Sequence, residues 1–350
     1  MSTVNIQDYI REQPEVMRRV LDEIPRAIRK FPDFLDAETV YMIGSGTSRN
    51  ALLAVEPFFS KCASSAVQIK GPLSFLNTAE GKKGGSSVAI ILSQTGTSTT
   101  TIQAVNHARG LGMRTITLTA EEKSPIVSAS SEVLIIPAGP EPVGPKTKGY
   151  SASVLSLLLL ALRPQNKNLQ VSSFLAAYAY LIEQSQDIMK AVAEDSREAD
   201  YFLVMGQDRH YATALEGSLK ITEMSGIPSG AFETEEAFHG RFHGLNSKSR
   251  AIFISASPAQ QEMAARGAAV LAELGVGVGI LNLSGGLASP FDLRLPWPPT
   301  TSFLGLDLLS AIVPFQYLGW HLARGKGMVP EKMRYPNLSK KLGIKTRVQA

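Results

Sequence analysis

Residues 87–101 read SVAIILSQTGTSTTT, an apolar run followed by a polar stretch that is dense in hydroxyl groups. The apolar run, residues 87–92, has the length and composition of a buried strand. Seven of the ten side chains from Leu92 to Thr101 carry a hydroxyl, and helical spacing then continues as far as Gly110 and Gly112. The order of strand, polar loop and helix is typical of one repeat of a parallel α/β sheet.

The same order recurs along the chain. Short apolar runs alternate with stretches of helical spacing. Because strands that are buried on both faces read as continuous apolar runs, this alternation predicts parallel sheets covered by helices on both sides. The predicted strands are residues 39–44, 87–92, 114–119 and 131–137 in the first half and residues 201–206, 251–256 and 277–283 in the second.

The two halves align with each other at a nearly constant offset. GTSRNALLAVE (46–56) precedes GQDRHYATALE (206–216) by 160 positions, and SVAIILS (87–93) precedes SRAIFIS (249–255) by 162 positions. The LG dipeptide at 111–112 recurs 163 positions later. We therefore expect an α/β protein of two tandem, doubly wound, parallel-sheet domains that are related by internal duplication.

The length fits this arrangement, since 350 residues allow two domains of about 150 residues each. We expect a leading helix and the first domain in residues 1–163, a helical linker in 164–198, the second domain in 199–325 and a C-terminal tail in 326–350. LRPQNKN (162–168) is the sequence most typical of a linker.

The composition argues against a nucleic-acid partner, a cysteine-based metal site and a membrane-spanning segment. The net charge is only +4 at pH 7, and the basic residues form no stripe, so no nucleic-acid partner is expected. The single cysteine, Cys62, excludes an intramolecular disulfide and argues against a cysteine-based metal site. The N-terminus lacks a signal-peptide core, and the most apolar stretch, VLSLLLLAL (154–162), is too short to span a bilayer. We expect a buried helix there, no membrane association, and a cytoplasmic location.

Two hydroxyl-rich loops, GSGTSRN (44–50) and SQTGTSTTT (93–101), follow predicted strands. Ligands of doubly wound sheets bind beyond the carboxyl ends of the strands, where backbone N–H groups and the helix dipole favour anions. The loops therefore predict a cradle for phosphate and sugar hydroxyls, although neither matches a known nucleotide-binding fingerprint. The alternative is that the serines and threonines only cap helices and form turns.

Five motifs in order give the chain a family resemblance: GSGTSRN, LSQTGTSTT, LEGSLKITEMSGIPSGAF, EEAFHGRF and NLSKK. Together they resemble the double sugar-isomerase (SIS) domain family, which includes the isomerase half of glucosamine-6-phosphate synthase and stand-alone fructosamine-6-phosphate deglycases. The resemblance runs over nearly the whole chain and implies two flavodoxin-like domains. The phosphate-binding residues that it implies are Ser45, Thr47, Ser48, Ser93, Gln94, Thr95 and Ser98.

The same resemblance implies four catalytic residues, Lys220, Glu223, His239 and Lys340. Moving a proton between neighbouring sugar carbons needs a carboxylate, and Glu223 is the candidate. His239 is the candidate for opening the sugar ring, and Lys340 could form a Schiff base or bind the ring oxygen. The alternative is that Lys220 and Glu223 are an exposed i, i+3 pair worth about 0.3 kcal/mol, and that His239 is an ordinary loop histidine.

Two departures from the family motifs concern the substrate. Lys146 replaces a serine when the Thr-Lys pairs are aligned, and Arg241 replaces the proline after His-Gly, with His243 close behind. We also expect no glutaminase domain ahead of the isomerase half. We therefore expect a cofactor-free and metal-free enzyme that acts as a deglycase or deaminase of a phosphorylated amino sugar. A non-catalytic sugar-phosphate regulator and a plain aldose–ketose isomerase are the alternatives. The family also implies at least a homodimer with a shared active site.

Overall fold

A computed structural model describes residues 5–31, 36–62, 66–78, 87–162, 171–285, 288–298 and 305–346. The expected linker sequence lies outside the described residues, apart from Leu162. The chain divides into two compact units, each assembled from separate segments. The first-sheet unit comprises residues 15–142, 148–169 and 335–350, and the second-sheet unit comprises residues 1–14, 143–147 and 170–334. The domain boundaries expected from the sequence stay a prediction.

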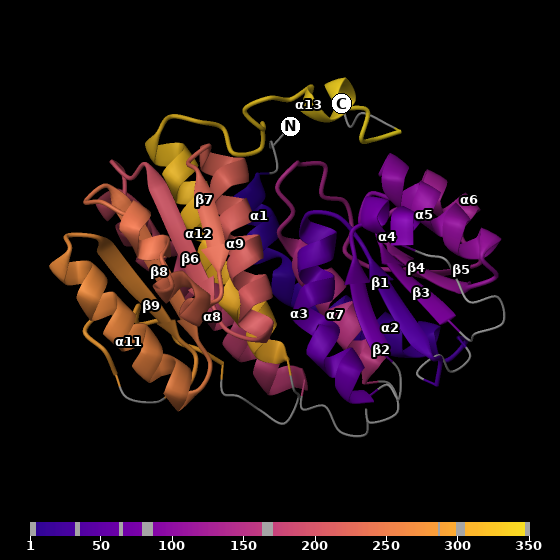
Figure 1. Cartoon of the computed structure of the whole chain (residues 1–350), viewed down its shortest axis with the longest axis horizontal. Helices are drawn as coiled ribbons and strands as arrows, with labels where there is room; N and C mark the ends of the chain where they lie inside the picture. The colour runs from indigo at the N-terminus through magenta and orange to yellow at the C-terminus, as the bar shows by residue number, and fades with distance from the viewer. Residues whose placement is uncertain are drawn as a thin grey trace. The chain divides into compact units, whose positions relative to one another are not determined.

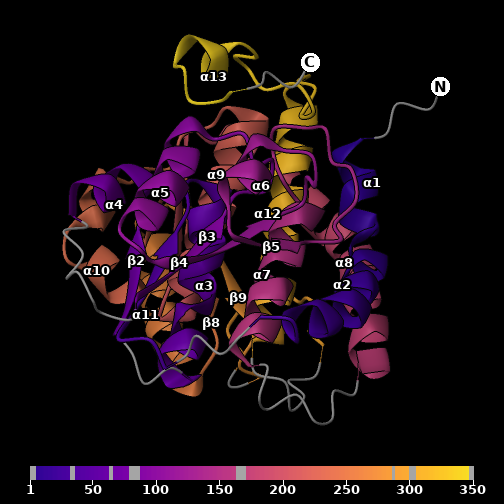
Figure 2. The same cartoon turned by 90° about the vertical axis from the view of Figure 1, so that its right-hand side faces the viewer.

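The first-sheet unit is built on five parallel strands in the order β2-β1-β3-β4-β5 (Figures 1 and 2). Buried side chains on one face of the sheet pack against α4, α5 and α6, and this core includes Phe75, Ile91 and Val105. Helices α3 and α7 pack against each other elsewhere in the unit. The elements are β1 (Thr39–Ile43), α3 (Thr47–Cys62), β2 (Ala66–Lys70), α4 (Pro72–Thr78), β3 (Ser87–Leu92), α5 (Thr99–Gly110), β4 (Arg114–Thr119), α6 (Pro125–Ala129), β5 (Glu132–Ile135), α7 (Lys148–Ala161) and α13 (Leu338–Lys341), and α2 (Gln13–Ile28) lies mostly in this unit.

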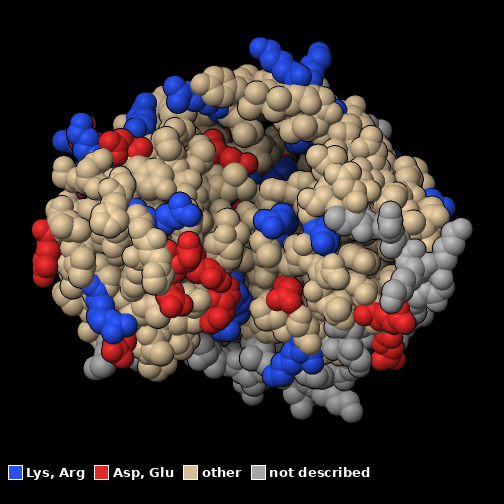
Figure 3. Space-filling view, in the orientation of Figure 1, with Lys and Arg blue, Asp and Glu red and all other residues tan. Residues whose placement is uncertain are grey.

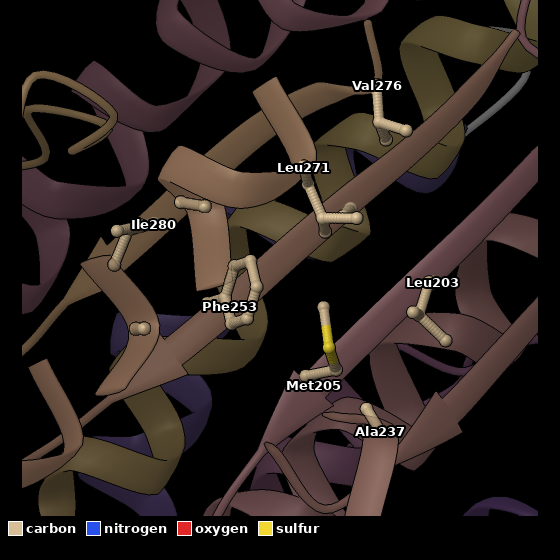
Figure 4. Close-up of a cluster of buried hydrophobic side chains, with 10 residues drawn as sticks. Leu203, Met205, Ala237, Phe253, Leu271, Val276 and Ile280 are labelled. Carbon is tan, nitrogen blue, oxygen red and sulfur yellow. The ribbon is translucent and has the colours of Figure 1, made fainter. Parts of the chain in front are cut away.

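The second-sheet unit is built on four parallel strands in the order β7-β6-β8-β9. Leu203, Phe253 and Leu271 belong to the core between this sheet and helices α10 and α11 (Figure 4). Helix α9 packs against β6, β7 and α12. The elements are α1 (Ile6–Arg11), α8 (Val171–Asp195), β6 (Tyr201–Gly206), α9 (Arg209–Ser225), β7 (Ser229–Phe232), α10 (Thr234–Phe238), the 3-10 helix η1 (Arg241–Gly244), β8 (Ser249–Ser255), α11 (Pro258–Glu273), β9 (Gly277–Asn282) and α12 (Leu306–Gly325).

The expected fold class and duplication are confirmed. The order β2-β1-β3-β4 of the first sheet is repeated by β7-β6-β8-β9 of the second, with all strands parallel. The starts of β1 and β6, Thr39 and Tyr201, are 162 positions apart, as are the starts of α3 and α9, Thr47 and Arg209. The offset of 160 positions used to align residues 46–56 with residues 206–216 should therefore have been 162.

Residues 154–162 form the last part of α7 and its C-terminal neighbour, and every residue of that helix is buried. The expected buried helix is confirmed. Within the described part of the chain, no helix combines the length and the apolar character that crossing a membrane requires.

Candidate active site

The loop after β3 holds its hydroxyl groups in a tight turn. Gly96 has a φ of 60°, a left-handed conformation that glycine adopts without strain. A side chain at this position would overlap the Ser124 hydroxyl. The Gly96 carbonyl also accepts a hydrogen bond from the Ile126 N–H at 3.1 Å. The turn therefore brings the backbone of residues 93–98 against α6 and leaves Ser93 and Thr97 almost buried.

Gln94 is held by a buried chain of hydrogen bonds. Its Nε2 donates to Ser153 Oγ at 3.1 Å, and that hydroxyl donates to the Gly149 carbonyl at 2.8 Å. The Gly149 N–H in turn donates to a carboxylate oxygen of Glu141 at 3.0 Å. Gly149 also lies so close to Gln94 that a β-carbon at position 149 would be only 2.4 Å from Gln94 Nε2. Only glycine fits at this position. The start of α7 thus fixes the orientation of the Gln94 amide.

The hydroxyl of Ser98 does not cap helix α5. Ser98 stands at the N-cap of α5, yet its side chain makes no capping bond to the helix backbone. Its Oγ accepts a bond from Thr101 Oγ1 at 2.9 Å, and the hydroxyls of Thr95 and Thr97 are also 2.9 Å apart. The alternative in which these residues serve mainly as caps does not account for Ser98, so the ligand interpretation is favoured.

The loop after β1 resembles the loop after β3. Gly46 has a φ of 55° and open space around its α-carbon. Ser45 is exposed, Thr47 is half-buried and Ser48 is buried at the start of α3. Because β1 and β3 are neighbours and parallel, their two loops lie at the same edge of the sheet. The structure therefore brings the seven predicted phosphate-binding residues to one edge.

The C-terminal tail runs alongside the loop after β3. The Thr99 N–H donates to the Ile344 carbonyl at 3.2 Å, and the Thr346 N–H donates to the Thr97 carbonyl at 2.8 Å. Ser98 and Lys345 form an antiparallel bridge. Lys340 lies at the end of this tail segment on α13 and is exposed. The tail thus carries the predicted catalytic lysine on the same compact unit as the phosphate loops.

Lys220 and Glu223 lie on α9 with a third charged residue, Glu216. Lys220 is fully buried, and its Nζ is 3.3 Å from Glu216 Oε1 and 2.5 Å from Glu223 Oε2. Glu216 is fully buried, whereas the Glu223 side chain is 18% exposed. The alternative of an exposed Lys220–Glu223 pair is wrong, because this lysine is buried and bridges two carboxylates.

The electrostatics of this trio keep Lys220 charged. Burial alone would lower the pKa of Lys220, but the neighbouring Glu216 and Glu223 carboxylates outweigh burial and raise the pKa above its ordinary value. The ammonium group is therefore a fixed positive charge at neutral pH. It orients the Glu223 carboxylate, the one member of the trio with a solvent-accessible side chain.

Close helix packing fixes the position of the trio. A β-carbon at Gly217 would lie 2.6 Å from the Phe315 ring, and one at Gly319 would lie 2.8 Å from the Lys220 carbonyl oxygen. These glycines let α9 and α12 pack closely, since Gly217 makes room for the Phe315 ring and Gly319 lies against the Lys220 backbone. Lys220 is therefore held on a rigid helix pair.

His239 and the two unusual family positions are more exposed. His239 follows α10 as its C-cap residue, and in the described residues no hydrogen bond or ion pair joins its ring to the α9 trio. Arg241 stacks on the Phe232 ring at 4.3 Å, and His243 is exposed in η1. Lys146 is half-buried in the second-sheet unit. His239 and the α9 trio belong to the second-sheet unit, whereas Lys340 and the phosphate loops belong to the first.

Sequence reasoning missed Glu216, although the signal was available. Glu216 and Lys220 have the i, i+4 spacing that brings helix side chains together. No local sequence pattern predicts that Glu216 is buried. Because it is buried beside Lys220, the three charged side chains form one group. Within the described residues no group of three or more histidine, cysteine, aspartate and glutamate side chains could hold a metal ion.

The fold is that of an α/β protein with two parallel sheets whose strand orders match. Residues 33–163 match the model of the SIS domain family. The chain is 27% identical over 363 residues to the isomerizing glutamine–fructose-6-phosphate aminotransferase of Gloeobacter violaceus. The alignment covers 96% of this chain and 58% of that protein. The chain is thus homologous to the isomerase part of such enzymes and spans about half the length of the curated relatives that it matches.

Solved structures agree with this fold. Glucosamine-6-phosphate deaminase from Thermotoga maritima matches with a TM-score of 0.73 and 22% identity, covering 93% of this chain and 98% of that one. Tagatose-6-phosphate ketose/aldose isomerase from Escherichia coli matches with a TM-score of 0.76 and 16% identity, covering 94% and 96%. At these identities the likeness establishes the fold of the whole chain, two parallel-sheet domains in tandem.

Proposed function

We propose that the chain is a phosphosugar isomerase-type enzyme acting as a deglycase or deaminase of a phosphorylated amino sugar, without a cofactor. Fructosamine 6-phosphates and glucosamine 6-phosphate are the substrate classes. The observation that carries the proposal is the buried Lys220, which holds Glu223 as an oriented carboxylate with a solvent-accessible edge. A protein that only bound sugar phosphates would have no use for such a group.

Binding would begin at the edge of the first sheet. The loops after β1 and β3 offer hydroxyls, backbone N–H groups and the N-termini of α3 and α5 to a phosphate. Neutral donors suit this task, because the phosphate keeps its charge and the helix dipoles partly offset it. Gln94, fixed by Ser153, would bind a sugar hydroxyl.

Chemistry would require the sugar to open and one proton to move. His239 would donate a proton to the ring oxygen while the anomeric hydroxyl gives one up. In an open-chain fructosamine, Glu223 would take a proton from C1 to give an enaminol and return it to C2. The resulting C1 imine would add water and release the amine. In glucosamine 6-phosphate the proton would move from C2 to C1, and the C2 imine would release ammonia.

Lys220 and Lys340 would have different roles. Lys220 stays charged and would stabilise negative charge near Glu223 and its substrate oxygen. Lys340 is exposed on α13, on the tail that borders the phosphate loop. We propose that its amine binds the ring-opening oxygen or forms a Schiff base with the open-chain ketose. The proposal also includes a cytoplasmic homodimer or larger homo-oligomer in which subunits share the site.

The test is direct turnover. The protein is incubated with fructosamine 6-phosphates and with glucosamine 6-phosphate, and release of amine or ammonia is followed. Glu223→Gln should lower kcat by about 10²–10⁴-fold, the usual contribution of a general acid–base group. The matched control is Glu183→Gln, an exposed glutamate on α8. Equal turnover by Glu223→Gln and the parent contradicts the mechanism, and micromolar binding of hexose phosphates without any turnover favours the regulator.

A further inference from the structure

Arg250 differs from the charged side chains of the molecular surface. Figure 3 shows lysine, arginine, aspartate and glutamate side chains on the surface of one face of the molecule. The side chain of Arg250 is only 17% exposed, and the residue lies near the amino end of β8. It lines a cavity of about 280 Å³ in the second-sheet unit, with further walls from α8, β6 and β9. This volume is close to the lower end of the range for small-molecule sites.

Two glycines of β9 make room for this cavity and for the arginine. Gly277 pairs with Arg250, and Gly279 pairs with Ile252, in the parallel register of β8 and β9. A β-carbon at Gly277 would lie 2.7 Å from Arg250 Nε, and one at Gly279 would lie 3.2 Å from a methyl carbon of Leu293. A larger residue at either position would therefore displace the arginine or take up space beside it.

The walls of the cavity are mainly apolar. Phe202 and Ile252 are buried residues of the neighbouring strands β6 and β8. The other apolar side chains in the lining are Ala191 and Val192 of α8, Val278 of β9, and Leu293. Among the described residues that line the cavity, the charged ones are Arg250 and Asp195. A ligand that fits must therefore combine an apolar body with one group that suits a guanidinium.

The guanidinium group is fixed in place but has a donor to spare. Nη1 donates to the carbonyls of Ser249 at 3.0 Å and Ser247 at 3.3 Å, and Nη2 donates to the Asp195 carbonyl at 2.9 Å. The last of these bonds caps the C-terminus of α8, the role of an ordinary structural arginine. Nε, however, is buried and has no hydrogen-bond partner within the described part of the chain. Because an unpaired buried donor is costly, capping alone does not account for Arg250.

The neighbouring Asp195 carboxylate is a poor partner for this donor. Asp195 Oδ2 is 3.8 Å from Arg250 Nε, which is beyond hydrogen-bond distance. The Asp195 side chain is also 81% exposed, so water solvates it and weakens the ion pair. Such a side chain can turn outward and leave its place beside Nε to the carboxylate of a ligand.

We propose that this cavity binds a small monocarboxylate with an apolar body, of the branched aliphatic or phenyl-substituted kind. The carboxylate accepts a hydrogen bond from Arg250 Nε, a charge-assisted bond of the kind that arginine forms well. The apolar body lies against Phe202, Ile252 and α8, where it leaves water. A sugar phosphate would be a poor occupant, because the apolar walls offer its hydroxyls no partners. The inference does not rest on the proposed function.

Ligand titrations of the full chain, followed by the amide resonances of Gly277 and Gly279, test the proposal. 4-Methylpentanoate and 3-phenylpropanoate should shift both resonances. The corresponding neutral amides should bind roughly tenfold more weakly or worse, because a hydrogen bond to a neutral acceptor is weaker than one to a carboxylate. Asp195→Ala should tighten binding of the two acids roughly threefold, because it removes the competing carboxylate.

Filling the cavity supplies the second test. Ala191→Phe places a ring in the cavity from an exposed position of α8 and should abolish binding of both acids. The matched control is Ala179→Phe, which changes an exposed alanine of α8 outside the lining and should leave binding as in the parent. Neither variant disturbs the bonds of Arg250 to α8, so both should fold.

Several outcomes overturn the proposal. If neither glycine resonance shifts at about 10 mM of either acid, the cavity is not a site for such ligands. Equal affinities for the acids and their amides would show that Arg250 does not recognise the carboxylate. Binding that survives Ala191→Phe would place the ligand elsewhere, and shifts confined to residues 93–101 would place it at the hydroxyl-rich loop.

Discussion

The carboxyl ends of the two sheets are related by duplication but differ in what occupies them. At the first sheet, the loops after β1 and β3 carry serine, threonine and glycine, and Ser98 makes no capping bond that consumes its hydroxyl. At the second sheet, Asp208 accepts a bond from Gln260, and Arg209 and His210 bind Asp307 on α12. The first edge is predicted to hold a ligand, whereas several polar side chains of the second edge bind one another.

The second edge is closed by two side-chain clusters. Asp307 at the start of α12 accepts hydrogen bonds from Arg209 Nη2 at 2.7 Å and lies 2.8 Å from His210 Nε2. Further along the edge, Asp292 accepts bonds from Gln261 at 2.9 Å and from Asn282 at 3.0 Å. These clusters satisfy the side chains of Arg209, His210, Gln261 and Asn282. The duplicated domain instead contributes α9, with its trio of charged residues.

Removing Asp307 should have the largest effect, and it tests whether the second edge serves stability. Asp307→Ala leaves the buried His210 and the partly buried Arg209 without their carboxylate, which should cost about 3–5 kcal/mol of unfolding free energy. The matched control is Asp195→Ala, whose 81% exposed side chain lies 3.8 Å from Arg250 and should change stability by less than about 1 kcal/mol. Urea unfolding measures both, and equal losses contradict the comparison.

The same carboxylate should make the protein sensitive to acid. Burial would raise the pKa of Asp307, but hydrogen bonds and charge from His210 and Arg209 lower it well below its ordinary value. A depressed folded-state pKa contributes stability that is present above about pH 3.9, the unfolded value, and is lost as the pH falls toward the folded value. Urea unfolding between pH 6 and pH 3 should therefore show that the unfolding free energy falls more steeply in the parent than in Asp307→Asn. Parallel curves would show that Asp307 does not cause the acid sensitivity.

Removing one hydroxyl should separate binding from folding at the first edge. Ser45→Ala deletes an exposed side chain, so its unfolding free energy should stay within about 0.5 kcal/mol of the parent. Its affinity for a hexose 6-phosphate should fall roughly tenfold, since a hydrogen bond to a charged group is worth about 1.5 kcal/mol. Gln207, 162 positions later, is the matched position in the second half, and calorimetry should show no change for Gln207→Ala.

The smallest expected effect concerns the backbone at matched positions. Asp208 has a φ of 53° and corresponds to Gly46, whose φ is 55°. Because this region strains a residue that has a β-carbon, Asp208→Gly should raise the unfolding free energy by up to about 1 kcal/mol, and Gly46→Ala should lower it by about 1 kcal/mol. Thermal unfolding measures both changes. A loss of stability in Asp208→Gly would mean that the Asp208 bond to Gln260 outweighs the strain.

Much of the fold followed from local patterns. The central strands β1, β3, β4, β6 and β8 were predicted from apolar runs because central strands bury both faces, and the edge strands β5 and β9 also carry apolar runs that were predicted. The strands β2 and β7 were missed. The sequence AVQIK of β2 is half-buried to exposed and contains polar residues, and SGAF of β7 is four residues long and half-buried. Edge strands of this kind lack the apolar run that marks a central strand.

The sequence by itself determined the alternation of strands and helices and the duplication, and it predicted the hydroxyl loops, Glu223 and Lys340 as site residues, because each of these is a local pattern or a motif. Only the tertiary structure decided that Glu216 joins Lys220, that Asp307 closes the second edge, and that the tail lies along Thr97 and Thr99. Asp307 is 97 residues from His210, and Thr346 is 249 residues from Thr97. Such pairings depend on burial and on chain path, and neither is encoded in any short stretch of residues.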